Sequence, residues 1–233
     1  IPPEISREEV ILINFHNLIN IIKSDKKGQV SQRQYAYEFC DTDLIMHMDD
    51  DIIIDINTLK ELLKQFDSLP YCSCLAPINR HHLDKNENHP IQKVLSNLFL
   101  CFAINPKPGS IAITSFPAPY FTKKLRGTDL PIKVDWLPGG ICLLHKDHLI
   151  RNQYFYFEGK AYCEDLIHSY LLNSNNIDLY LSPNCFYQTP EEAYMQLTIQ
   201  QFIKFIYQDS TNRNYYRKLK SNPIFPLLVA YMF

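Results

Sequence analysis

Residues 44–51, Leu44-Ile-Met-His-Met-Asp-Asp-Asp51, decide how we interpret this sequence. The first five residues form a short run that is apolar almost throughout, which is typical of a buried strand. Three aspartates, Asp49, Asp50 and Asp51, follow at once. Ligands bind beyond the ends of strands in open α/β sheets, because the loops there are free to carry function. The stretch therefore predicts a core strand that leads directly into an acidic functional loop.

Three adjacent carboxylates repel one another unless a cation or several hydrogen-bond donors neutralise them. Mg²⁺ and Mn²⁺ are hard cations that bind one or two carboxylates together with phosphate oxygens. If the strand continued through the triplet, Asp49 and Asp51 would point to the same side, which suits a shared cation. The alternative is a solvated acidic turn that caps the next element.

Strand and helix signals alternate along the chain, which indicates an α/β fold. Leu59, Leu62, Leu63 and Phe66 recur at i, i+3, i+4 and i+7, as on one face of a helix. Further strands are expected at 18–22, 71–76, 111–114, 134–136, 141–145 and 178–181. Further helices are expected from residue 7 onward and at 31–39, 91–104, 166–172 and 190–208, the last with Thr189 as its N-cap.

The amino-acid composition favours a folded globular protein over a nucleic-acid-binding or disulfide-rich one. The 233 residues are 46% hydrophobic, which suffices for a sizeable core, and the net charge of −2 gives no basic footprint for nucleic acid. Seven scattered cysteines favour reduced thiols and a cytoplasmic location over a disulfide scaffold. No run reaches the ~18 apolar residues that span a bilayer. The sequence begins at Ile1 rather than Met, which indicates a fragment.

A second acidic site is expected at Glu164-Asp165. Leu166-Ile167 and Leu171-Leu172 follow it, so the pair should lie at or near a helix N-terminus. The helix dipole favours ionised carboxylates there, and a purely structural role at the helix start is one reading. The other reading is a general base, for which the dipole is a mild cost because it lowers basicity.

Taken in order, these pieces resemble the inverting glycosyltransferases of family 2, in particular those of bacterial surface-polysaccharide synthesis. The matching segments are 27–33, Leu44–Asp51 with its Asp-x-Asp signature, Asp135-Trp-Leu-Pro-Gly-Gly140, 157–165 with the acidic pair, and the strand 179–183. The resemblance implies a GT-A-like nucleotide-diphospho-sugar transferase fold, a mixed central sheet flanked by helices with a C-terminal helical extension. It divides the chain into a catalytic domain at 1–188 and a helical segment at 189–233.

The resemblance also implies a reaction and a set of site residues. A sugar would move from a nucleotide-diphosphate donor to a hydroxyl of a glycan or lipid-linked acceptor, with inversion and with Mg²⁺ or Mn²⁺. Asp165 would be the general base, with Glu164 as its neighbour, and Asp49 and Asp51 would bind the metal. The implied donor contacts are Asp49, Asp50, Arg33, Trp136, Gly139 and Gly140. For Arg33 a surface salt bridge is an open alternative.

Three features depart from the family pattern. Nothing before Ser6 resembles the strand and loop that bind the nucleotide base, so we expect the first nucleotide-binding strands to be missing and residues 1–233 alone to bind nucleotide weakly. Gln188 stands where some members carry a metal-binding His. Arg33-Gln34 replaces the common Arg-Asn pair before the metal strand.

Two other sequence patterns, a group of Cys and His residues and a basic aromatic segment, each allow more than one interpretation. Cys72, Cys74, His81, His82 and His89 could suggest zinc, but the spacing is too tight and two buried thiols beside a polar loop explain it. Residues 211–220 mix cations with aromatics and resemble an Arg-Asn-x-Tyr-Tyr segment of bacterial polysaccharide glycosyltransferases. They predict either a helix at the inner face of the cell membrane or an ordinary amphipathic helix packed on the domain. A nucleotidyltransferase and a non-catalytic glycosyltransferase-like binding domain remain the competing functions.

Overall fold

The computed structural model describes residues 22–80, 107, 109–111, 117, 128–152, 155–157, 161–189 and 198–220. The contacts divide the chain into two units, residues 1–41 with 150–161 and residues 42–149 with 162–233. The first unit contains helix α2 (Gln29–Tyr37), close to the predicted 31–39. Within this unit, the Gln34 side chain donates to the Asn152 carbonyl at 2.6 Å and Arg151 donates to the Tyr37 carbonyl at 3.2 Å.

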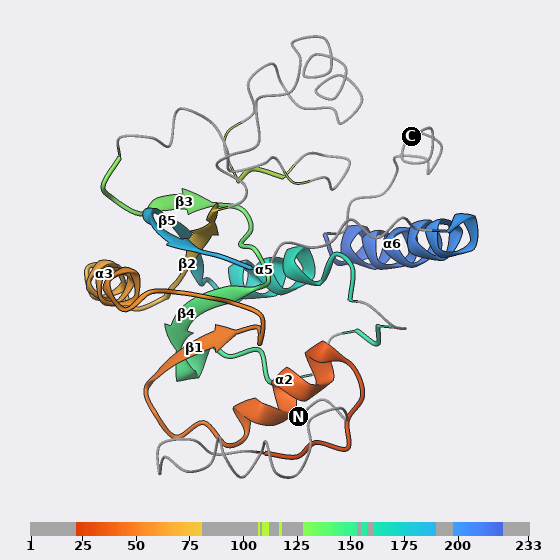
Figure 1. Cartoon of the computed structure of the whole chain (residues 1–233), viewed down its shortest axis with the longest axis horizontal. Helices are drawn as coiled ribbons and strands as arrows, with labels where there is room; N and C mark the ends of the chain where they lie inside the picture. The colour runs from red at the N-terminus through yellow and green to blue at the C-terminus, as the bar shows by residue number, and fades with distance from the viewer. Residues whose placement is uncertain are drawn as a thin grey trace. The chain divides into compact units, whose positions relative to one another are not determined.

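The second unit contains a five-stranded sheet in the order β1-β4-β2-β5-β3 (Figure 1). Its strands are β1 (Leu44–Met48), β2 (Ser73–Asn79), β3 (Ile132–Val134), β4 (Ile141–His145) and β5 (Asp178–Tyr187). Only β2 and β5 are parallel among the paired strands described; the other neighbours are antiparallel. The prediction of an α/β fold with a mixed sheet is confirmed.

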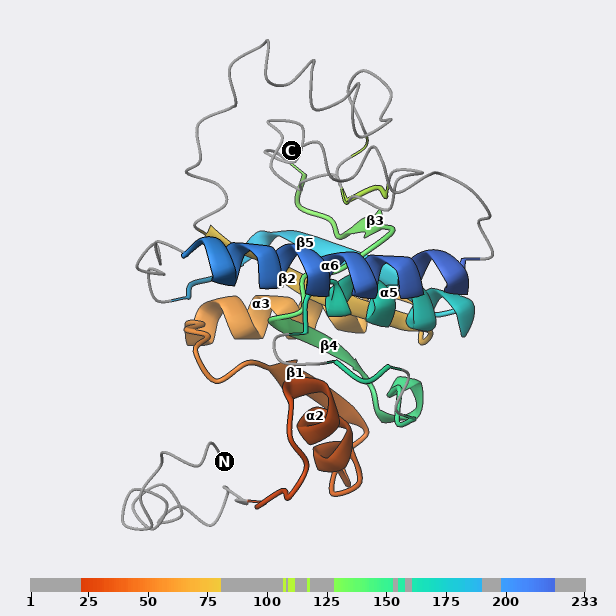
Figure 2. The same ribbon diagram turned by 90° about the vertical axis from the view of Figure 1, so that its right-hand side faces the viewer.

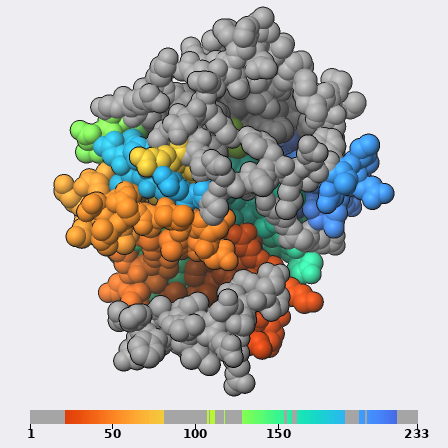
Figure 3. Space-filling view, viewed as in Figure 1, coloured from red at the N-terminus to blue at the C-terminus, as the bar shows by residue number. Residues whose placement is uncertain are grey.

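Helix α3 (Ile56–Asp67) covers one face of the sheet. Asp55 caps its first turn by accepting hydrogen bonds from the backbone N–H groups of residues 57 and 58. The predicted apolar face supplies Leu62 and Phe66, which pack in one cluster with Leu75 of β2 and Leu143 of β4. In the space-filling view α3 and β5 lie side by side at the surface (Figure 3).

Helix α5 (Glu164–Ser174) lies on the opposite face (Figures 1 and 2). Side chains alternate between the faces of a strand, so His47, next to Met46, points away from the α3 cluster. His47 pairs with Cys142 across the β1–β4 ladder, and its ring lies 6.3 Å from the ring of His168 on α5. The acidic ends of β1 and α5 are thus brought to the same face.

Helix α6 (Ile199–Leu219) packs against α5 (Figure 2). The buried ring of Tyr216 lies 6.0 Å from that of Tyr170, whose hydroxyl donates to the Leu219 carbonyl at 2.7 Å. A continuous helix from 190 to 208 is wrong, because Thr198 has extended backbone and caps α6 in a capping box with Gln201. None of the described helices combines the length and apolar character that a membrane crossing requires.

Two strands differ from their predicted positions. The strand predicted at 134–136 lies earlier, as β3, because Asp135 leaves the ladder and accepts a hydrogen bond from the Ile111 N–H at 3.1 Å. Strand β5 runs beyond the predicted 181 and past Pro183, which lacks an N–H; its register with β2 shifts between Ala76 and Ile78. A 3₁₀ turn, η3 (Lys146–His148), follows β4.

Some predictions fall on residues outside the described ranges. These are the helix start at residue 7, the strand at 18–22 except for its last residue, the helix at 91–104, most of the strand at 111–114, His81, His82, His89 and the apolar run 224–233.

Candidate active site

The aspartate triplet forms a turn directly after β1. The Asp49 N–H donates to the Gly140 carbonyl at 2.8 Å, and the Ile52 N–H approaches the Asp49 carbonyl at 3.4 Å. Ile53 then exchanges two backbone hydrogen bonds with Gln188, at 2.8 and 2.9 Å. The premise that Asp49 and Asp51 alternate along a continuing strand is wrong, because the strand ends at Met48 and the chain turns. Asp50 and Asp51 are exposed on this turn, and Asp49 is half-buried.

The Gly139–Gly140 turn joins the two acidic groups. A Cβ placed on Gly140 would lie 3.0 Å from Cδ1 of Ile52, 3.4 Å from the Tyr187 hydroxyl and 3.9 Å from a carboxylate oxygen of Asp49. A Cβ on Gly139 would lie 3.3 Å from Oε2 of Glu164 and 3.5 Å from Cβ of Asp165. Only glycines allow such a close approach without displacing neighbours. One turn therefore contacts both predicted acidic sites.

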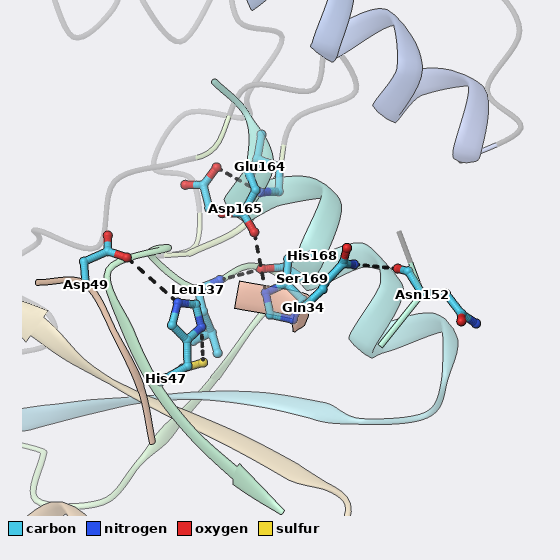
Figure 4. Close-up of polar contacts among 11 residues, drawn as sticks. Gln34, His47, Asp49, Leu137, Asn152, Glu164, Asp165, His168 and Ser169 are labelled. Carbon is cyan, nitrogen blue, oxygen red and sulfur yellow. Dashed lines mark hydrogen bonds and ion pairs between the residues drawn. The ribbon is translucent and has the colours of Figure 1, made fainter. Parts of the chain in front are cut away.

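The acidic pair opens helix α5, as predicted. Cys163 precedes it as N-cap in left-handed backbone conformation, with φ 65°. Glu164 is buried, and its Oε1 lies 3.8 Å from Nδ1 of His168, one helical turn on. Asp165 accepts a hydrogen bond from the Leu166 N–H at 2.9 Å (Figure 4).

Burial and the neighbouring Glu164 charge raise the pKa of Asp165 from its ordinary 3.8 to about 6. A backbone N–H bond and the charge of Arg213 act in the opposite direction. Burial and the Glu164 charge therefore outweigh the loss of basicity that the helix N-terminus was expected to cause in Asp165. A carboxyl group with a pKa near 6 is mostly ionised at pH 7 and more basic than a solvated aspartate, which suits a general base.

Two buried histidines lie beside the carboxylates and were not predicted. Nε2 of His47 lies 4.0 Å from Oδ1 of Asp49, and its Nδ1 lies 3.7 Å from Sγ of Cys142 (Figure 4). His168 approaches Glu164 in the same way from α5. The signal in the sequence was a polar His47 inside an otherwise apolar strand.

Tyr187, at the end of β5, is a further site residue that the sequence did not reveal. Burial raises the pKa of its hydroxyl to about 12, and the charges of Asp49, Asp51 and Asp165 add to the shift. The hydroxyl therefore lies within the electrostatic reach of both acidic groups. Its position depends on β5 running as far as residue 187.

The segment around Trp136 is hydrogen-bonded to α5. The Leu137 N–H donates to Oγ of Ser169 at 2.9 Å, and the Asn173 side chain donates to the Asp135 carbonyl at 3.2 Å. Trp136 lies between these anchors and is half-buried. Its contact with a donor stays a prediction. The same holds for Arg33, which lies on α2 in the first unit.

The carboxylates fit a hard divalent cation. Within the described ranges, no three His, Cys, Asp or Glu side chains form a ready ligand group. Mg²⁺ and Mn²⁺ need only one or two carboxylates when phosphate oxygens complete the shell. Asp49 and Asp51 supply such oxygens from one turn, and Gln188 lies beside it through its pairing with Ile53.

Comparisons with known proteins agree with this fold. A family model described as Glycosyl transferase family 2 matches residues 6–135, more than half of the chain. A similar solved structure is that of GalNAc-T7 with UDP, GalNAc and Mn²⁺, at 14% identity and a TM-score of 0.51. The match covers 90% of this chain and 41% of that one, so the chain spans less than half of that protein. No curated protein sequence matches significantly. The predicted GT-A-like fold is confirmed.

Proposed function

The chain belongs to glycosyl transferase family 2, and from that premise we propose that it moves a sugar from a nucleotide-diphosphate donor to a hydroxyl of a glycan or lipid-linked acceptor. We propose that the reaction is metal-assisted and inverts the anomeric carbon. The observation that carries the proposal is the Gly139–Gly140 turn, which contacts Asp49 on one side and Glu164-Asp165 on the other. A donor site and a base beside one turn are what a direct displacement needs.

Asp49 and Asp51 are the residues that would hold Mg²⁺ or Mn²⁺ with the donor diphosphate. When bound, such a cation neutralises charge that develops on the leaving group. His47 faces the Asp49 carboxylate from the buried side of β1, with its Nε2 4.0 Å from Oδ1 of Asp49. Asp50, Trp136 and the two glycines are the other proposed donor contacts, and the role expected for Arg33 stays a prediction from the sequence. The presence of UDP and Mn²⁺ in the GalNAc-T7 structure supports the use of a nucleotide donor with a divalent cation.

Asp165 is the proposed general base. An acceptor hydroxyl is too weak an acid to attack unaided, so its proton must pass to a neighbouring group in the transition state. Asp165 is only partly buried and has a raised pKa, whereas Glu164 is buried and already faces His168. These differences favour Asp165 as the group that contacts the acceptor hydroxyl. Glu164 is then the group whose charge raises the pKa of Asp165.

We further propose a role in cell-surface polysaccharide synthesis, in the cytoplasm at the inner face of the cell membrane. What supports membrane contact is a stripe on α6, Ile199, Ile203 and Tyr207, whose residues are 79, 61 and 69% exposed. The stripe lies at i, i+4 and i+8, and the exposed Lys204 flanks it. An apolar stripe beside a cation suits an anionic interface.

Calorimetry with Mn²⁺ and a panel of UDP-sugars on the whole protein tests the donor site. Asp51→Asn should abolish metal-dependent donor binding without loss of the fold, because it removes a ligand and also relieves repulsion within the triplet. Asp67→Asn, on the exposed end of α3, is the matched control. Unchanged metal dependence in Asp51→Asn would contradict the assignment. Normal donor binding without transfer to any acceptor would favour the non-catalytic binding domain instead.

A further inference from the structure

Helix α6 contacts the segment that carries the proposed base. The buried Asn212 donates from its side-chain amide to the Tyr162 carbonyl at 2.7 Å. The ring of Tyr162 meets that of Phe205, also on α6, edge to face at 4.8 Å. Residues 205, 209, 212 and 216 recur at helical spacing, so one face of α6 lies along this segment and α5.

The segment that α6 holds has an unusual backbone. Tyr162 leads into Cys163, whose left-handed conformation turns the chain into α5 directly before Glu164-Asp165. A non-glycine residue in this region costs roughly 1 kcal/mol or more and persists where its surroundings hold it. The Asn212 hydrogen bond fixes the carbonyl just before the strained residue. A shift of this turn would shift Asp165 with it.

Charge from α6 also reaches Asp165. Nε of Arg213 donates to Oδ2 of Asp209 at 2.7 Å, which holds the guanidinium in a largely buried position. Arg213 lowers the pKa of Asp165, against the stronger effects of burial and of Glu164. Further titratable groups that interact with the Asp165 charge are Cys163, beside it on the chain, Tyr187 on β5 and Tyr216 on α6.

We propose that α6 is a positioning element of the active site: Asn212 holds the Tyr162–Asp165 turn, and the Arg213–Asp209 ion pair lies beside it on the same helix. The role given to Asp165 rests on the proposed function, whereas the coupling of α6 to this carboxyl group does not. Asn212 and Arg213 touch no reacting atom and act through Asp165. Residues after the sheet are thereby part of the catalytic apparatus rather than an appendage to it.

Two readouts on the whole protein test the coupling. The first is the carboxyl pKa of Asp165, followed by ¹³C NMR, with Asp165→Asn to assign the signal. Arg213→Gln should raise this pKa above the value of about 6, because a favourable positive charge is lost. Arg213→Lys should largely restore it. Lys218→Gln removes an equal charge from the exposed side of α6 and should leave it unchanged.

The second readout is transfer kinetics. Asn212→Ala should lower kcat by about 10–100-fold with little change in donor KM, since a displaced base slows the chemical step. Asn214→Ala is the control on the same helix. If Asn212→Ala fails to fold, the Arg213 pair of variants still decides the question.

An unchanged Asp165 pKa in Arg213→Gln, or a normal kcat in folded Asn212→Ala, would overturn the inference. A parent protein that transfers no sugar, but whose Asp165 pKa responds to Arg213, refutes the proposed function and still supports the coupling.

Discussion

Replacing Asp165 with Asn should stabilise the fold at neutral pH. The carboxyl pKa is about 6 in the folded protein against an ordinary 3.8, because burial and the Glu164 charge disfavour ionisation. Folding therefore favours the protonated form of Asp165. The stability that this preference gives the folded state is complete below about pH 3.8 and is lost as the pH rises through 6. At about 1.4 kcal/mol per pH unit, ionised Asp165 costs the folded state at most about 3 kcal/mol at pH 7.

Urea unfolding of the parent and Asp165→Asn at pH 7.5 and pH 5 measures this cost. Asn keeps the shape of the side chain and still accepts the hydrogen bond from Leu166. The variant should gain up to about 3 kcal/mol at pH 7.5 and about half of that at pH 5. Asp178→Asn, which removes a surface carboxylate 2.7 Å from Lys133, should give no gain. A variant no more stable than the parent at pH 7.5, or a gain equal at both pH values, would refute the reasoning.

Two further substitutions probe the donor pocket. Gly140→Ala should lower the free energy of unfolding in urea by about 1–3 kcal/mol, because its Cβ crowds Ile52 at 3.0 Å and the Tyr187 hydroxyl at 3.4 Å. The same change should weaken donor binding in calorimetry. Binding and stability equal to those of the parent would contradict the close approach. Gln188→His adds an imidazole beside the acidic turn and should tighten Mn²⁺ binding, whereas Gln188→Ala should not. Equal Mn²⁺ affinity in both Gln188 variants would count against a cation between Asp49 and Asp51.

The local signals in the sequence predicted much of the sheet and the places of the two acidic groups at the ends of their elements. Strands β1 and β4 have the predicted bounds, because each is an almost entirely apolar run with polar or glycine residues beyond its ends. Helix α3 follows its apolar periodicity. Asp49 and Asp165 could be proposed because each follows or opens an element whose end is visible in the sequence.

Features that depend on pairing between distant segments were not predictable. His47 meets Cys142 only through the register of β1 with β4, and nothing local specifies that register. Tyr187 reaches the site because β5 continues past a proline, which normally signals a strand end. The contact of Asn212 with Tyr162 spans 50 residues and requires α6 to dock on α5.

Measuring donor binding and sugar transfer side by side in Asp165→Asn tests the proposed role of Asp165 most directly. The whole protein carrying this change should bind its nucleotide sugar with Mn²⁺ nearly as the parent does, because Asp49 and Asp51 are untouched. Transfer to the acceptor should fall by about 10²–10⁴-fold, the usual effect of losing a general base. Transfer at close to the parent rate would contradict a general-base role and leave Asp165 as no more than the start of a helix.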